Sequence, residues 1–294
     1  MTREPFLVAA SLSGAADAEW ARAAAEHVDA ALLGGVALDP ASRAAARDLV
    51  ARGRSEFLPA DPLAFVAAQL DALADAPVRP GVNVRSATAG PIRDVARICA
   101  DRGAVCEVNA HCRQSELRAV GCGESLLADA DRLARSVAAA SGTGATTSVK
   151  VRAEVPGVDL RAVAETVAAA GADWLHVDAM DSEAVVADLA AAVDDAAGGG
   201  DGGALADLTV VANNGVRGRE TVAEYAAHGA DAVSVGRPTE DPPVLARVAD
   251  AVAEWRGGTP RGRAGGAGAG TGGGAGGGGR RRGGGGRRAG GGGG

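Results

Sequence analysis

Residues 147–179, TSVKVRAEVPGVDLRAVAETVAAAGADWLHVDA, contain the unit that decides the fold. Two short runs rich in valine and other apolar residues, 147–153 and 174–179, flank a segment of helical length at 159–170. The apolar residues of that segment recur at spacings of three and four, as on one face of a helix. A strand, a helix and a second strand in this order predict two parallel strands joined by a crossover helix.

The same alternation extends along the chain in both directions. Proline stands in the first turn of several expected helices, as in Asp61-Pro62, Gly90-Pro91 and Asp241-Pro242. Eight repeats favour an α/β fold closed into a (β/α)8 TIM barrel over residues 1–256, with an open doubly wound sheet as the alternative. The expected strands are 6–12, 30–38, 81–85, 104–110, 147–153, 174–179, 208–212 and 232–236, and the expected helices are 15–27, 40–52, 62–75, 91–102, 125–140, 159–170, 183–196, 219–228 and 242–255.

The composition indicates a cytoplasmic protein with no membrane or metal partner. Apolar residues make up 47% of the chain, yet no apolar run approaches the ~20 residues that span a bilayer. The N-terminus lacks the basic and apolar regions of a signal peptide. The four cysteines show no spacing typical of a zinc site or a disulfide framework.

Charge and lysine usage are uneven along the chain. The net charge is −7, but residues 257–294 hold seven arginines and no acid, so residues 1–256 carry −14. The Gly/Arg-rich segment 257–294 cannot bury a core, and we expect a disordered tail; the segment 198–206 reads as a flexible insertion. Lys150 is the single lysine beside 29 arginines. A position that requires a compact ammonium, which the planar guanidinium of arginine cannot replace, would explain why this one lysine is kept.

Polar residues gather where the expected strands end, which is where such barrels place their reactive groups. Together they indicate a site for an anionic cofactor or substrate. The glycines after the last two strands, in Asn213-Asn214-Gly215 and Gly236-Arg237, also suit a phosphate held by backbone N–H groups. The strand-end residues are Asn83, Arg85, Glu107, Asn109, His111, Cys112, Arg113, Gln114, Lys150, Arg152, His176, Asp178, Asn213, Asn214, Gly236 and Arg237.

The order of these motifs resembles the tRNA-dihydrouridine synthases, FMN-dependent TIM barrels related to dihydroorotate dehydrogenases, and in particular an archaeal branch of that family. The resemblance covers roughly residues 80–240. It is carried by Val108-Asn-Ala-His-Cys112, Gly121-Cys-Gly-Glu-Ser-Leu-Leu127, Val149-Lys-Val-Arg152, His176, Val211-Ala-Asn213 and Val235-Gly-Arg237.

The resemblance implies a role for each matching residue. Lys150 and His176 would contact the flavin, and Asn83 would be a polar flavin ligand. Cys112 would be the general acid, with a hydride delivered to the uracil ring and a proton from the thiol completing its reduction. The phosphate of FMN would lie on Asn213, Gly215, Gly236 and Arg237; the substrate would contact Asn109, His111, Arg113 and Arg152.

The function implied is reduction of a uracil ring, most directly uridine in tRNA, with NADPH or NADH as electron donor. The chain departs from the family pattern at Arg113, where a proline is usual, and at Ala9-Ala-Ser-Leu-Ser13, where a Pro-Met segment is expected. No helical RNA-binding domain follows Trp255 in this sequence.

Other interpretations stay open at this point. A free-pyrimidine enzyme of the dihydroorotate dehydrogenase type would use Arg85, Arg113 and Arg152 to hold a carboxylate. A catalytically silent barrel would bind a phosphorylated metabolite without flavin. Cys122 is a second candidate acid, because a helix start after it would lower its pKa. His111 could equally bind substrate or pack.

Overall fold

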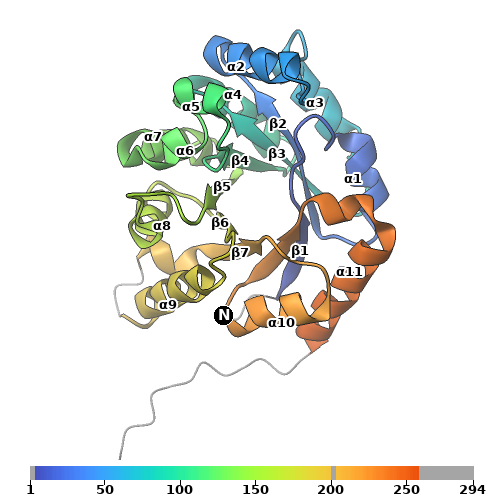
Figure 1. Cartoon of the computed structure of the whole chain (residues 1–294), viewed down its shortest axis with the longest axis vertical. Helices are drawn as coiled ribbons and strands as arrows, with labels where there is room; N and C mark the ends of the chain where they lie inside the picture. Colours follow the sequence, from blue (N-terminus) through green and yellow to red (C-terminus); the bar gives the residue numbers. More distant parts are fainter. Residues whose placement is uncertain (1–3, 200–202, 258–294) are drawn as a thin grey trace, which may run out of the picture. The chain divides into compact units, whose positions relative to one another are not determined.

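The computed structural model describes residues 4–199 and 203–257, and these form a closed barrel of eight parallel strands. Each strand pairs with the next, and β8 pairs with β1 to close the ring. Helices lie outside the ring in chain order (Figure 1). The predicted (β/α)8 TIM barrel is confirmed. The strands are β1 (Phe6–Ala9), β2 (Ala30–Ala37), β3 (Arg79–Arg85), β4 (Val105–Asn109), β5 (Thr146–Arg152), β6 (Trp174–Asp178), β7 (Thr209–Asn213) and β8 (Ala232–Val235).

The helices follow the predicted order, with differences at the ends and after β4. The expected helix 125–140 is divided, because Asp129 accepts a hydrogen bond from Arg132 N and so begins a new helix. The helices are α1 (Ala18–Ala24), α2 (Pro40–Ala51), α3 (Pro62–Asp71), α4 (Ala89–Ala100), α5 (Ser115–Ala119), α6 (Glu124–Leu127), α7 (Ala130–Ser141), α8 (Leu160–Ala169), α9 (Ala184–Gly198), α10 (Arg219–Ala227) and α11 (Pro242–Gly257), with short 3₁₀ helices η1 (Ala204–Asp207) and η2 (Arg237–Glu240).

Two further predictions, the tail and the insertion, concern parts of the chain that lie partly outside the described residues. Of the expected tail 257–294, Gly257 ends α11 and the rest lies outside the described residues. Of the expected insertion 198–206, Gly198 ends α9, 204–206 lie in η1, and 200–202 lie outside the described residues. Within the described ranges, no helix is both long enough and apolar enough to cross a membrane.

The alternation of side chains along each strand sorts the core into two parts. On β5, Val149 and Val151 face outward and belong to the large apolar core between the strands and the helices. Ser148 and Lys150 occupy the intervening positions and face the barrel interior. The valine-rich and alanine-rich composition therefore serves the packing of helices on the outside of the ring.

The interior of the barrel changes from apolar to polar along its axis. At the end where the strands begin, Phe6 and Trp174 pack with ring centroids 5.1 Å apart, and Arg79 lies over the Trp174 ring at 5.8 Å. Val8, Leu32 and further small apolar residues complete this layer. The polar residues follow toward the carboxyl ends of the strands, so the interior is packed with apolar side chains at one end and polar at the other.

Asp39 connects two loops at the carboxyl ends of the strands. It is the N-cap of α2 and accepts hydrogen bonds from Ala41 N and Ser42 N. Its other oxygen accepts from Ser86 Oγ at 2.8 Å and from Ala87 N at 2.7 Å, in the loop after β3. Burial would raise the pKa of Asp39, but the bonds from Ser86, Ala87 and Ser42 outweigh burial and lower it.

We expect Asp39→Ala to destabilise the barrel by about 2–4 kcal/mol, because it removes a helix cap and leaves buried donors without partners. Asp61→Ala is the matched control. Asp61 caps α3 with the same pair of backbone bonds but is exposed, so its loss should cost about 1 kcal/mol. Urea unfolding of both variants measures the difference, and equal losses would show that the link to the loop after β3 contributes nothing.

Candidate functional site

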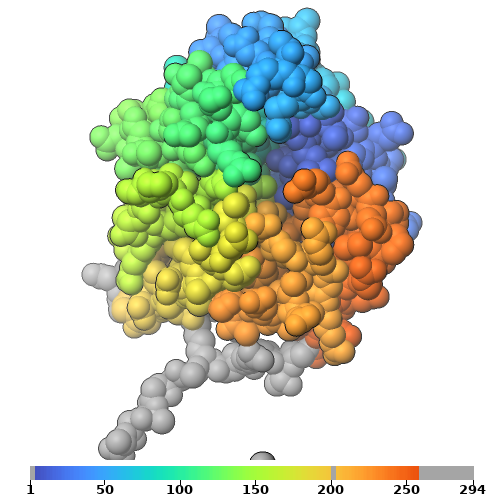
Figure 2. All heavy atoms as spheres, viewed as in Figure 1, coloured from blue at the N-terminus to red at the C-terminus, as the bar shows by residue number. Residues whose placement is uncertain are grey.

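A cavity of about 380 Å³ opens at the carboxyl ends of the strands. This volume lies within the range of about 300–1,000 Å³ found for small-molecule sites. Figure 2 shows a recess near the middle of this face, where the blue, green and orange segments meet. The lining residues come from the ends of β1 and β4 to β8 and from the loops that follow them: Ala10, Ser11, Leu12, His111, Cys112, Arg113, Gln114, Lys150, Arg152, Asp178, Met180, Asn213, Asn214, Gly215, Val216, Arg217, Ser234, Val235, Gly236, Arg237 and Pro238.

The wall of this cavity is strongly cationic although the protein as a whole is acidic. One acidic residue, Asp178, stands among the lining residues of the described chain against one lysine and four arginines. Such a concentration of one charge raises the local concentration of anions. The cations are Lys150, Arg113, Arg152, Arg217 and Arg237.

Lys150 is the cation whose surroundings say most about a ligand. The residue is 4% exposed, and its charge lowers the pKa of the nearby Glu107 carboxyl. No hydrogen bond or ion pair joins its side chain to the described residues, and its nitrogen is not among their buried atoms without a partner, so the ammonium reaches the cavity that the residue lines. Arg152, two residues further along β5, does have an ion-pair partner, because its Nε lies 3.6 Å from Oε1 of Glu124. A buried ammonium is costly without a partner. Because Lys150 lines the cavity, an anionic or electron-rich ligand atom there would supply the missing partner.

Beneath the cavity lies a network of buried polar groups centred on Glu107 of β4, which is fully buried. Its Oε1 accepts a hydrogen bond from Asn83 Nδ2 at 2.7 Å. Its Oε2 accepts from Ser148 Oγ at 2.9 Å and lies 2.7 Å from His176 Nδ1. The carboxylate thus joins β3, β5 and β6 to β4. Asn83 Oδ1 accepts in turn from Asn109 Nδ2 at 2.8 Å.

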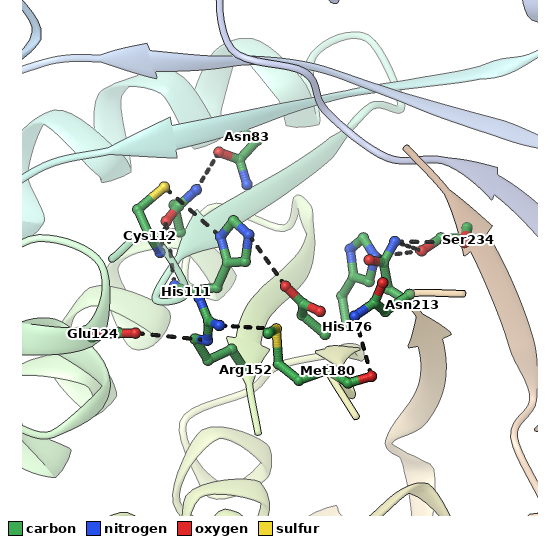
Figure 3. A network of polar contacts seen from close by, with 12 residues as sticks. Asn83, His111, Cys112, Glu124, Arg152, His176, Met180, Asn213 and Ser234 are labelled. Carbon is green, nitrogen blue, oxygen red and sulfur yellow. Dashed lines mark hydrogen bonds and ion pairs between the residues drawn. The ribbon is translucent and has the colours of Figure 1, made fainter. Parts of the chain in front are cut away.

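The donors and acceptors of this network fix the tautomer of His176. Asn213 donates through Nδ2 to Ser234 Oγ, so the Ser234 hydroxyl is free to donate to His176 Nε2, 2.7 Å away. His176 Nδ1 then carries the proton and donates it to Glu107. Figure 3 shows Asn213, Ser234 and His176 side by side at the ends of β7, β8 and β6.

Burial and charge decide the protonation of the pair. Burial and the charge of Lys150 lower the pKa of His176, so its imidazole is neutral at pH 7. Burial alone would raise the pKa of Glu107, but His176, Lys150 and the bond from Asn83 outweigh it and lower the pKa to about 2. The centre of the network is therefore a buried carboxylate, with the Lys150 ammonium as the nearby charge of opposite sign.

The structure brings most of the predicted site residues to one place. Nine of them line the cavity: Cys112, Lys150, Asn213, Gly215, Gly236, Arg237, His111, Arg113 and Arg152. Asn83, Asn109 and His176 do not. They are 0–3% exposed and lie in the network below, where each is bonded to protein partners. A direct contact of these three with a ligand stays a prediction.

Arg85 differs from its expected place. It is 3% exposed, does not line the cavity, and donates through one terminal nitrogen to Glu56 Oε2 at 2.5 Å and through the other to Ser13 Oγ. Burial would lower the pKa of Arg85, but Cys112 and Glu56 raise it. Its guanidinium therefore ties the loops after β1 and β2 to β3, and is not available to hold a substrate carboxylate.

The two candidate thiols belong to one buried cluster but differ in their access to the cavity. Cys112 lines the cavity, and its backbone N–H donates to Asn109 Oδ1 at 3.2 Å. Cys122 is 1% exposed, lies off the cavity wall and packs with Leu117 and Ala45. The sequence-based expectation of a lowered pKa for Cys122 is wrong, because burial raises its pKa to about 12. The following helix, α6, is a single turn and cannot offset that burial.

Sequence reasoning noted Glu107 and Asp178 as polar strand ends without giving them a role, and it missed Ser148, Ser234 and Arg217. The signal for Glu107 is a carboxylate in the middle of an otherwise apolar strand, since such a residue needs partners from neighbouring strands. The serines carry no comparable signal, because a hydroxyl at an inward position is compatible with simple packing.

The comparisons with known proteins support the architecture. No family model matches the chain. An uncharacterized protein of Methanocaldococcus jannaschii is 28% identical over 123 residues, which are 41% of this chain and 48% of that protein, so the match spans about half of this relative. Among solved structures, DHODH of Eimeria tenella, in complex with ferulenol, has a TM-score of 0.58 at 14% identity, with 85% of this chain and 80% of that chain covered.

A FabK structure from Thermotoga maritima has a TM-score of 0.49 at 15% identity. The match covers 81% of this chain and 62% of FabK, so this chain spans less than two thirds of that protein. At such identities a structural likeness shows the fold alone. The chain therefore has the barrel fold that it shares with DHODH, and its function rests on its own site.

We expect the buried Glu107 carboxylate to make stability depend on acid pH. Its pKa is about 2 in the folded protein against the ordinary value of 4.5 for a glutamate side chain, so its contribution is complete above pH 4.5 and is lost as the pH falls toward 2. The full effect is about 3 kcal/mol, of which about 2 kcal/mol is lost by pH 3. Unfolding free energies of the wild type and Glu107→Gln at pH 6 and pH 3 measure it.

Glu107→Gln should also be less stable at pH 6, because its amide nitrogen would face a donor of the network. Glu165→Gln, on exposed α8, is the control and should follow the wild type at both pH values. A wild type and a Glu107→Gln variant that lose equal stability between pH 6 and pH 3 would contradict an ionised Glu107.

Proposed function

We propose that this protein is an FMN-dependent oxidoreductase that reduces a uracil ring, with uridine in tRNA as the substrate. The observation that carries the proposal is the Lys150 ammonium, which is presented to a cationic cavity at the carboxyl ends of the strands without a hydrogen bond or ion pair to the described residues. The resemblance of the strand-end motifs to the tRNA-dihydrouridine synthases and the fold shared with DHODH support it.

The residues present fit a flavin nucleotide. At Gly215 a Cβ atom would meet nothing within 4 Å, and at Gly236 its nearest neighbour would be Leu12 Cδ2 at 3.7 Å, so the backbone of both loops is open to the cavity. The Gly215 N–H donates to Asn214 Oδ1 at 2.9 Å, so the open backbone at Gly236, beside Arg237, is the part of these loops that suits a phosphate. Lys150, at the inner end of the cavity, suits the electron-rich edge of a flavin ring.

The residues of the chain would divide the work of binding and orientation. Bound FMN supplies the hydride for the reduction. Lys150 offsets negative charge at the inner end of the cavity, and Arg237 binds the phosphate at the outer end. The network of Glu107, His176 and Ser234 holds Asn213 on the wall, so a contact made there is rigid before the ligand arrives.

Cys112 would be the proton donor. It is held at the wall by the bond from its own backbone N–H to Asn109, and its thiol faces the cavity with a proton that it can give to carbon. The proton leaves the sulfur as the new C–H bond of the uracil ring forms. The role of Asn109 is then to position Cys112 through the backbone.

A second candidate is an enzyme of the dihydroorotate dehydrogenase type acting on a free pyrimidine. It is favoured by Arg113 and Arg152, which line the cavity and could hold a substrate carboxylate. Arg113 is exposed, whereas Arg152 already neighbours Glu124. The measurement that separates the two candidates is the dihydrouridine content of bulk tRNA from cells that lack this protein, since an unchanged content removes the tRNA substrate.

We expect the purified protein to be yellow and to contain FMN in equimolar amount. Lys150→Met should weaken FMN binding roughly 10- to 100-fold, because a charge-assisted contact is lost. Lys150→Arg should retain FMN but reduce its rate of reduction by NADPH or NADH, because the planar fork cannot take the place of an ammonium. Arg135→Met, on the exposed face of α7, is the control for loss of charge. A colourless wild type that does not bind added FMN would disprove the proposal.

We expect Cys112→Ala to keep FMN and its reduction by the nicotinamide cofactor, yet to lose about 10²-fold or more of uridine reduction, because the proton donor is gone. Cys122→Ala should retain the activity, since Cys122 lies off the cavity wall with its pKa near 12. Stopped-flow flavin spectra and dihydrouridine formation on unmodified tRNA measure the two steps separately. The opposite pattern, with Cys122→Ala inactive, would transfer the role to Cys122.

A further inference from the structure

The thiol of Cys112 is the first of three polar groups that follow one another along the cavity wall. Its Sγ lies 3.8 Å from Nδ1 of His111, and Nε2 of the same imidazole lies 3.8 Å from Oδ2 of Asp178. All three residues line the cavity. Figure 3 shows His111 between the Cys112 thiol and the carboxylate to which its other nitrogen points. The imidazole is therefore placed to carry a proton to or from the thiol.

The positions of the protons follow from the donors and acceptors. A carboxylate only accepts, so the 3.8 Å separation from Asp178 Oδ2 favours the tautomer of His111 with the ring proton on Nε2. Nδ1 is then unprotonated and faces the thiol. Burial and the charge of Lys150 lower the pKa of His111 well below its usual value, so the resting imidazole is neutral. The titratable and charged groups that face Cys112 or His111 are Arg85, Cys122, Lys150, Arg152, His176 and Asp178.

His111 also reaches solvent more readily than the thiol does. Its side chain is 25% exposed, whereas Cys112 is 5% exposed. A proton donor that acts once per turnover needs a route by which its proton is replaced. Of the two groups, the imidazole is the one more open to water and lies 3.8 Å from the sulfur.

We propose that His111, oriented by Asp178, returns a proton from solvent to Cys112 after each turnover. This inference rests on the proposed function, in which the thiol gives its proton to the substrate. His111 acts through Cys112 and does not touch the reacting carbon, so it is a positioning and relay residue. Nothing in the resemblance to a known family assigns it this task.

The proton balance of the relay is closed within each turnover. The S–H bond of Cys112 breaks as the C–H bond of the product forms, which leaves a thiolate. The guanidinium of Arg85 faces that sulfur and offsets its charge. The new negative charge beside Nδ1 favours protonation of His111, which takes one proton from water or a buffer acid. Nδ1 then passes that proton to the thiolate, and both groups return to their resting forms.

The first experiment separates the first turnover from later ones. FMN-loaded His111→Gln is mixed with the nicotinamide cofactor and an excess of unmodified tRNA, and dihydrouridine is measured with time. The first round should proceed within about twofold of the wild type, since Cys112 is already protonated, and the steady rate should fall about tenfold or more. Added imidazole should restore the steady rate. Equal slowing of the first and later rounds would overturn the relay, because it would indicate a structural or substrate-binding role.

The second experiment does not depend on turnover. Nitrogen-15 spectra of histidine-labelled protein should show His111 neutral at pH 7 with its proton on Nε2, and the signal is assigned by its loss in His111→Gln. Asp178→Asn should mix the two tautomers, because an amide can donate as well as accept. A proton on Nδ1 in the wild type would overturn the relay, since the imidazole would then have no free acceptor facing the thiol.

The control is His228→Gln. His228 follows α10, away from the cavity wall, and the variant should match the wild type in both phases and in the His111 signal. A wild type that binds FMN but reduces no uridine would count against the proposed function alone. The tautomer measurement on His111 would then test the proton relay without turnover. Failure of the relay can therefore be distinguished from failure of the proposed function.

Discussion

The site depends on one buried charge, the carboxylate of Glu107. Taking a carboxylate out of water is strongly unfavourable unless hydrogen bonds and an opposite charge compensate it. Three other strands provide hydrogen-bond donors to its two oxygens. The series of hydrogen bonds continues from His176 through Ser234 to Asn213 on the cavity wall. The strands must therefore keep one register, because a shift by one residue would turn these groups to the outer face.

The position of this charge explains the division of the barrel interior. Below the carboxylate the interior is filled by aromatic and aliphatic side chains, and above it the cavity wall is cationic. A buried anion between these two regions makes an ammonium at Lys150 less costly than it would be in an apolar barrel. The lone lysine of the chain, its burial and its lack of a bonded partner are consistent with a single requirement, a positive charge presented to a ligand.

The fold was predictable because a repeated period is a redundant signal. A short apolar run was enough to predict each strand. The expected helix 125–140 is in fact divided after Leu127, and this error in one element did not alter the predicted topology. Residues whose side chains line the cavity were predictable in the same way, since strand ends converge in a barrel. The contacts between side chains were not predictable in this way. Ser148 and Glu107 are 41 positions apart, and Arg85 and Glu56 are 29 apart. Whether such side chains meet depends on the direction in which each points, and no local sequence pattern encodes that direction.

The packed base of the barrel has a consequence for the order of events. Phe6, Trp174 and Arg79 fill the interior where the strands begin, so in the part of the chain that the structure describes the cavity communicates with solvent from the opposite end. Two reactants that need the same inner surface cannot approach it from two sides. In the proposed reaction, an electron donor would therefore have to depart before an electron acceptor arrives, and each would appear in kinetics as a competitor of the other.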